Sequence, residues 1–174
     1  RSGSLALSVR LWQIGSGQIE RGFVGFRVGI KSPMKDYRAT AIYGRGLNAG
    51  INADGRLFIG ELIDSAPKIN LSNDLDLHLD AQPSESGYTV VLRATSIQGS
   101  HSAQTTREIP PDWLTGGLAL VCSSTPVVPT PAPQEPIHDF NFYPPQQHLG
   151  GTMRFWFTDW TVGGSKVDKH DDHA

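Results

Sequence analysis

The stretch GGTMRFWFTDWTVGG, Gly150–Gly164, decides the fold class of this chain. It holds two of the four tryptophans in an aromatic and β-branched run between two glycine pairs. Such a composition favours a pleated strand over a helix. Both faces carry large apolar groups, so we expect the strand to be covered on both sides, with Asp159 as the one charge amid its aromatics. Strict alternation places Trp156, Thr158, Trp160 and Val162 on one face and Phe155, Phe157, Asp159 and Thr161 on the other.

Other segments show strand patterns of their own. Ile51–Ile59 is the strongest hairpin signal, because Asp54-Gly55 supplies the positive φ angles of a tight turn. The one helical feature is a short turn expected at Pro110–Leu114, since proline fits the first turn of a helix. We count at least seven strands, which indicates an all-β protein built as an antiparallel two-sheet β-sandwich. The remaining strands are expected at Leu5–Ile14, Phe23–Ile30, Leu75–Asp80, Tyr88–Ser96, Leu118–Cys122 and Arg154–Val162.

The length and the charge of the chain limit the number of domains and the kinds of binding partner. A chain of 174 residues fits one domain and buries roughly 70% of its unfolded surface. A net charge of −2 with 18% charged residues gives no basic footprint for nucleic acid or a membrane surface. No run of about 18 apolar residues occurs, so no membrane span is expected. The single cysteine, Cys122, lies in an apolar run and is expected to be a small buried side chain.

Residues 123–149 differ from the rest, because seven of the twelve prolines lie there. Proline cannot donate to a sheet ladder, so the segment predicts a long extended excursion. An interdomain linker is the alternative, but the segment carries Phe140, Phe142 and Tyr143 and only one core-type strand follows it. We therefore expect a single domain over residues 1–174, with this loop packed on the sandwich. Because the chain starts and stops in polar sequence, we also expect it to be a piece of a longer protein.

The strand expected at Leu75–Asp80 carries a polar stripe. Its leucines are expected to face the core, while Asp76, His78 and Asp80 face outward, because successive side chains alternate. The stripe could accept sugar hydroxyls or hold a hard cation such as Ca²⁺, although no cofactor is required. The alternative is an ordinary solvent-facing stripe on a half-exposed antiparallel sheet. The tail cluster His170–His173 is interpreted as a solvated chain end rather than a metal site.

Arg27 and Arg93 each interrupt an apolar strand. On the Arg27 face of its strand the neighbours are glycines, so something is expected to lie close to that backbone. The two arginines could grip an anionic or hydroxyl-rich ligand, or each could pair with a neighbour across the strands. Tyr37 and Arg38 lie in a polar, aromatic segment that suits either a sugar site or loop anchoring. The tryptophans in strand context are interpreted as core residues: Trp12, Trp156 and Trp160.

The sequence lacks the common catalytic motifs, with no Gly-x-Ser-x-Gly, no His-Glu-x-x-His and no phosphate-binding glycine loop. A retaining glycosidase needs two carboxylates about 5–5.5 Å apart. Asp76 and Asp80, four residues apart on one strand, are roughly 13 Å apart at strand rise. A polysaccharide lyase could use Tyr37 or His78 as a base beside Arg93, which leaves lyase chemistry as a further alternative.

Five ordered segments carry a family resemblance: Gly22–Gly29, Asp36–Arg38, Gly46–Ile51, Asp54–Gly60 and Phe155–Trp160. Together they resemble the N-terminal region of secreted bacterial proteins related to the alkaline phosphatase D family. In those proteins a concanavalin/laminin G-like sandwich precedes a metallophosphatase domain. The resemblance covers most of the chain.

The resemblance implies a jelly-roll sandwich of the concanavalin A/laminin G type in an exported setting, extracellular or periplasmic. It implies an ancillary role beside a phosphoesterase domain and no catalytic residue, because that family's metal-binding motifs are not matched here. Three hypotheses follow: a non-catalytic module that binds polysaccharide, a structural domain that docks on its own downstream enzyme domain, and a jelly-roll glycosidase or lyase. The candidate ligand-binding residues are Arg27, Tyr37, Arg38, Asp76, His78, Asp80 and Arg93.

Overall fold

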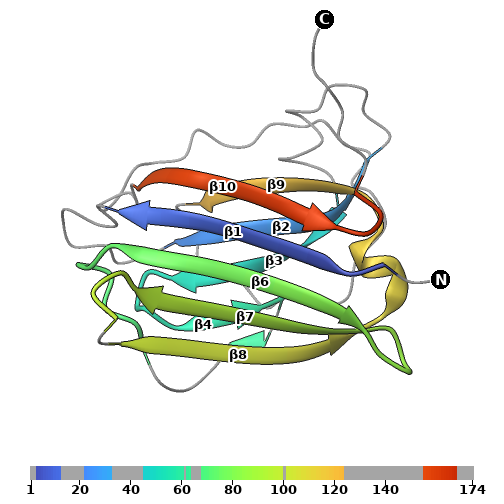
Figure 1. Ribbon diagram of the computed structural model, residues 1–174, viewed down its shortest axis with the longest axis horizontal. Coiled ribbons are helices and arrows are strands. Elements are labelled where there is room, and N and C mark those ends of the chain that lie inside the picture. The colour runs from blue at the N-terminus through green and yellow to red at the C-terminus, as the bar shows by residue number, and fades with distance from the viewer. Residues whose placement is uncertain are drawn as a thin grey trace, which may run out of the picture.

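The computed structural model describes residues 3–12, 22–32, 45–60, 62–63, 68–99, 101–123 and 155–167. Ten strands lie within these residues and form two five-stranded antiparallel sheets, one behind the other (Figure 1). The prediction of an all-β, antiparallel two-sheet sandwich is therefore confirmed. Of the excursion expected over residues 123–149, residues 124–149 lie outside the described residues, as does the histidine cluster of the tail.

The sheet nearer the viewer in Figure 1 is called the front sheet, with strand order β10-β1-β6-β7-β8. Each neighbouring pair in it is antiparallel. The strand β10 that closes the fold pairs with β1, so the two ends of the described chain lie side by side. Its strands are β1 (Leu5–Trp12), β6 (Leu75–Pro83), β7 (Tyr88–Ser96), β8 (Ser102–Ile109) and β10 (Trp156–Gly164).

The back sheet has strand order β5-β4-β3-β2-β9. A short 3-10 helix, η1 (Pro111–Leu114), leads from β8 of the front sheet into β9 of the back sheet. It confirms the helical turn expected from the prolines. The back-sheet strands are β2 (Phe23–Lys31), β3 (Arg45–Asn52), β4 (Leu57–Ile59), β5 (Leu62–Ile63) and β9 (Gly117–Ser123).

Alternating apolar residues build the core between the sheets. Along β6, Leu75, Leu77 and Leu79 are fully buried, while the aspartates and the histidine between them are half-buried or exposed. The side-chain period of two along a strand therefore separates the core face from the outer face as predicted. The hairpin is also confirmed, because Gly55 has a φ of 84° in the turn between β3 and β4.

Both faces of β2 are covered. On the core face Val24, Phe26 and Val28 are fully buried, and on the other face the Phe23 ring meets Phe58 edge-on at 5.3 Å. Gly29 has a φ of 62°, and a Cβ added there would lie 1.8 Å from the Trp113 carbonyl oxygen of η1. The expectation of a close neighbour to the backbone of this strand is confirmed at Gly29, where the neighbour is η1.

The strict alternation predicted for β10 is wrong. Asp159 has a φ of 54°, and the pairing with β1 shifts register between Ser8 and Arg10, so two residues of β10 stand opposite Val9. This is a β-bulge, which re-aims the side chains beyond it. Trp160 therefore packs on the core, whereas Trp156 points outward with 63% of its surface exposed. Within the part of the chain that the structure describes, no segment covers the outer face of the strand at Trp156.

Two further features differ from the sequence analysis. Strand β8 was not predicted, because its inward positions include Ala103, Thr105 and Arg107 and give only a weak apolar signal. Cys122 is exposed rather than buried, since it lies on β9 at the edge of the back sheet. Its surroundings still remove water from the thiol and raise its pKa.

Candidate functional site

The outer face of the front sheet gathers most of the polar candidates. Antiparallel pairing places side chains of neighbouring strands in rows that cross the sheet, and residues directly opposite each other share a face. Two such rows cross all five strands. The ion-pair row consists of Thr158, Arg10, Asp76, Thr95 and Ser102, and the histidine row consists of Thr161, Ser8, His78, Arg93 and Gln104.

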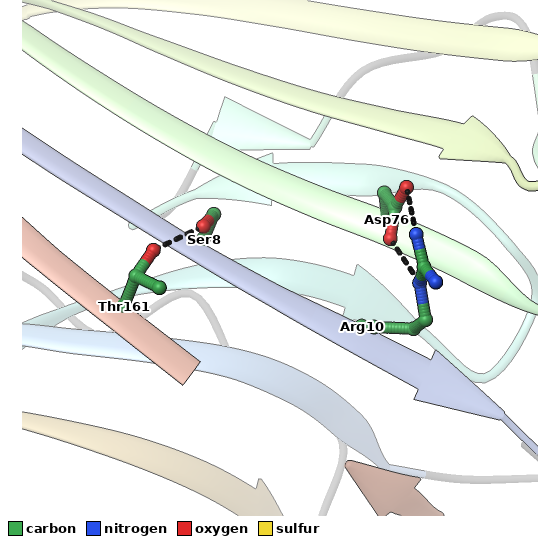
Figure 2. Close-up of polar contacts among 4 residues, drawn as sticks. All are labelled: Ser8, Arg10, Asp76 and Thr161. Atoms are coloured by element: carbon green, nitrogen blue, oxygen red, sulfur yellow. Dashed lines mark hydrogen bonds and ion pairs between the residues drawn. The ribbon is translucent and has the colours of Figure 1, made fainter. Parts of the chain in front are cut away.

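Arg10 and Asp76 form a forked ion pair at the centre of the ion-pair row (Figure 2). Arg10 Nε donates to Asp76 Oδ1 at 2.8 Å, and Nη2 donates to Oδ2 at 3.2 Å. The hydrogen bond to Asp76, and then its charge, raise the pKa of Arg10. The side chains are 42% and 31% exposed, so the pair contributes little to stability. What it does is hold both groups in a fixed orientation on the surface.

The histidine row is ordered by hydrogen bonds on both sides of His78. The Ser8 and Thr161 hydroxyls bond to each other across β1 and β10 (Figure 2). On the other side, Arg93 donates from Nε and Nη2 to Gln104 Oε1 at 3.0 and 2.8 Å. His78 lies between these pairs, directly opposite both Ser8 and Arg93, and is exposed. Its ring is therefore accessible between two ordered groups.

Two tryptophans stand opposite each other at one end of the same face. The register pairs Trp12 of β1 with Trp156 of β10. Trp12 lies two residues from Arg10, so the indoles and the ion pair share the outer face. Trp12 is half-buried and Trp156 is 63% exposed. The interpretation of these two residues as core is wrong, because the sequence does not show the bulge that separates Trp156 from Trp160.

The structure brings together four of the seven predicted ligand-binding residues. Asp76, His78, Asp80 and Arg93 share the outer face of the front sheet, with Asp80 one row beyond His78. Arg27 does not join them, because it lies on β2 of the back sheet, where a Cβ added at Gly46 would come within 3.0 Å of its Nε. The other two candidates, Tyr37 and Arg38, lie outside the described residues.

No group of three or more His, Cys, Asp or Glu side chains that could hold a metal ion occurs among the described residues. Asp76, a member of the predicted Ca²⁺ stripe, is already engaged by Arg10. Binding of Ca²⁺ stays a prediction. For hydrolysis or elimination chemistry, the face offers an exposed His78 directly opposite Arg93, and the Arg93 guanidinium is hydrogen-bonded to Gln104.

Neither a scan of the sequence against protein-family models nor a search of curated proteins gives a match. Within the described residues, no helix has both the length and the apolar character needed to cross a bilayer.

Proposed function

We propose that this sandwich is a non-catalytic module that binds carbohydrate through the outer face of its front sheet. The observation that supports it is the Trp12–Trp156 pair beside the Arg10–Asp76 ion pair. A sugar ring has an apolar face that can stack on an indole and hydroxyls that need fixed donors and acceptors. The face supplies both within neighbouring rows.

Preorganisation supports the same proposal. Arg10 and Asp76 hold each other, and Arg93 is held by Gln104, before any ligand arrives. A ligand then orders few flexible side chains on binding, and each immobilised side chain costs about 0.5–1.5 kcal/mol. This advantage is largest for a ligand that bonds through many weak hydroxyl contacts.

A glycan array followed by calorimetry tests the proposal, with and without Ca²⁺. We expect binding of at least one polysaccharide and a loss of about tenfold or more in the Trp156→Ala variant. Cys122→Ser, exposed on β9 of the back sheet and so away from the proposed face, is the control and should bind normally. The proposal fails if no neutral or acidic glycan binds under either condition.

A second proposal follows from the resemblance to sandwich regions that precede a metallophosphatase domain in extracellular or periplasmic proteins. Here the module docks on its own downstream enzyme domain. Phe157 supports this, because it is 53% exposed although it lies on the core side of β10, opposite Leu11. In the full-length protein, Phe157→Ser would then loosen contact between the domains in limited proteolysis. Unchanged cleavage between the domains would argue against docking.

A further inference from the structure

A third row lies next to the ion-pair row, at the tryptophan end of the front sheet. Each of its members lies two residues beyond a member of the ion-pair row. On β1, Trp12 follows Arg10 by two residues. Just before β6, Asp74 precedes Asp76 by two, and just after β7, Ile97 follows Thr95 by two. The Ile97 amide donates to the Asp74 carbonyl at 2.9 Å, which continues the β6–β7 ladder by one more pair. We call this the apolar row, and its members are Trp156, Trp12, Asp74 and Ile97.

Ile97 faces the same side as the tryptophans. Ile97 is the first residue after β7, and its bond to Asp74 extends the strand pairing to it. Since Ser96 beside it is 1% exposed and faces the core, Ile97 faces outward, where it is 42% exposed. Among the described residues, the exposed large apolar side chains are Ile97, Trp156 and Phe157. Two of these three therefore stand at opposite ends of a single row, on strands that are far apart in sequence.

The spacing of strands sets the length of this row. Neighbouring strands are about 4.8 Å apart, so three intervals from β10 to β7 span about 14 Å. The ion-pair row runs parallel to it, two residues away along each strand, which is about 6.6 Å. The apolar row, whose apolar side chains are interrupted by Asp74, and the ion-pair row thus lie side by side and cross the strands at right angles.

Charge on these rows bears on the ligand. Arg10 is the one cation of these two rows, and Arg93 lies in the adjoining histidine row; against them the same face carries Asp74, Asp76 and Asp80. Asp159 also acts on Arg10, since both Asp74 and Asp159 raise its pKa through their charges. The surplus is negative, and a polymer with carboxylate or sulfate groups would be repelled.

We infer that the ligand is a neutral linear polysaccharide, bound across the strands along the apolar row from Trp156 to Ile97. This inference rests on the proposed carbohydrate function. It adds the direction in which the ligand crosses the sheet, the length of ligand that is bound and the charge of the ligand. An internal stretch of chain fills the row, whereas a single terminal sugar would reach only the tryptophan pair. Ile97 then forms the far end of the site, although no sequence motif marks it.

Calorimetry with neutral oligosaccharides of increasing length, taken from the polymer that binds best, tests this directly. Affinity should rise with length until the chain spans about 14 Å and then level off. Trp156→Ala should weaken every length, whereas Ile97→Ser should weaken only the longer chains, by about tenfold. Val91→Ser, half-buried on the same outer face of β7 but outside both rows, is the matched control.

The outcomes separate this inference from the proposed function. If short and long chains bind equally well, or if Ile97→Ser has no length-dependent effect, the lengthwise site is wrong while carbohydrate binding stands. Tighter binding of an acidic polymer than of its neutral counterpart would overturn the assignment of charge. If no glycan of any length binds, the proposed function itself has failed.

Discussion

The Trp160 ring stacks on the Phe26 ring at 5.5 Å with 25° between their planes, and this contact joins the two sheets. Trp160 lies on β10 at the edge of the front sheet, and Phe26 lies in the middle of β2 in the back sheet. Aromatic pairs of this kind contribute about 0.5–1.5 kcal/mol beyond the burial of their surface. The closing strand is therefore held to the sandwich by Trp160, which leaves Trp156 available on the outer face.

The two tryptophans of β10 should respond to mutation in different ways. Trp160→Ala removes the contact with Phe26 and should lower the free energy of unfolding by about 2–4 kcal/mol. Trp156→Ala removes a side chain that is 63% exposed and should change it by less than about 1 kcal/mol. Urea denaturation measures both values. Equal losses in the two variants would contradict the opposite orientations of these rings.

The bulge at Asp159 should tolerate glycine and resist β-branched residues. A φ of 54° is strained for most L-residues, but aspartate and glycine adopt it more readily. Asp159→Gly should therefore stay within about 0.5 kcal/mol of the wild type, while Asp159→Val should cost about 1–2 kcal/mol. Thermal unfolding checks the difference. A valine variant as stable as the glycine variant would show that this backbone is not held in the left-handed region.

Arg107 should stabilise the packing of the two sheets, because it lies on β8 of the front sheet and bonds to β4 of the back sheet. Its Nη1 donates to the Ile59 carbonyl at 2.7 Å, and its guanidinium lies 5.5 Å from the centre of the Trp113 ring. Arg107→Met keeps the aliphatic stem but leaves that carbonyl without this donor, so we expect a loss of about 1–3 kcal/mol.

Arg93→Met is the matched control for Arg107, because Arg93 is exposed and bonds to another exposed side chain. Its effect on unfolding should stay below about 0.5 kcal/mol. Denaturant titration of the two methionine variants side by side measures the contrast. If both variants lose the same stability, the bond to Ile59 is not the reason.

Glu108 should make the stability of the sheet depend on pH in the acidic range. Hydrogen bonds from the Thr89 hydroxyl, and then from Ser84 at 2.7 Å, lower the pKa of Glu108 below its ordinary 4.5. Because the pKa of Glu108 is lower in the folded state than in the unfolded state, ionised Glu108 stabilises the fold. This contribution is fully present at pH values above the unfolded-state pKa. That contribution is lost as the pH falls through the folded pKa. Glu108→Gln should thus lose stability at neutral pH and match the wild type under strongly acidic conditions, as measured by unfolding at a series of pH values.

A methyl group at Gly29 should be far more harmful than one at Gly99. Both glycines have positive φ, 62° and 71°, so alanine pays a similar backbone cost of about 1–2 kcal/mol at each. At Gly29 the new Cβ would also lie 1.8 Å from the Trp113 carbonyl oxygen, whereas at Gly99 nothing lies within 4 Å. Gly29→Ala should therefore unfold at clearly lower urea concentration than Gly99→Ala. Equal midpoints would contradict the close approach of η1 to β2.

Local patterns predicted most of the strands. The leucines of β6 and the turn at Gly55 could be placed from sequence, because alternation and turn chemistry depend on neighbouring residues only. Strand β8 was missed for the same local reason. Its inward Thr105 and Arg107 are not apolar, and the partners of Arg107, the Ile59 carbonyl and the Trp113 ring, lie on other elements that no short window contains.

The candidate site depended more on tertiary structure. The outward stripe of Asp76, His78 and Asp80 was correctly placed on one face of its strand. Its separation from Arg27 could not be predicted, because the order of strands decides which sheet a residue joins. The same holds for the partners that Asp76 and Arg93 find on neighbouring strands.

The sequence by itself determined that this chain forms strands, and which side chains of most strands face the core, since both follow from the period of two along an extended backbone. Only the tertiary structure decided that Trp156 faces outward beside Trp12 while Trp160 packs on Phe26. The physical reason is the bulge at Asp159. It arises from pairing with β1, a strand about 150 residues away, and it reverses the alternation that the sequence of β10 alone implies.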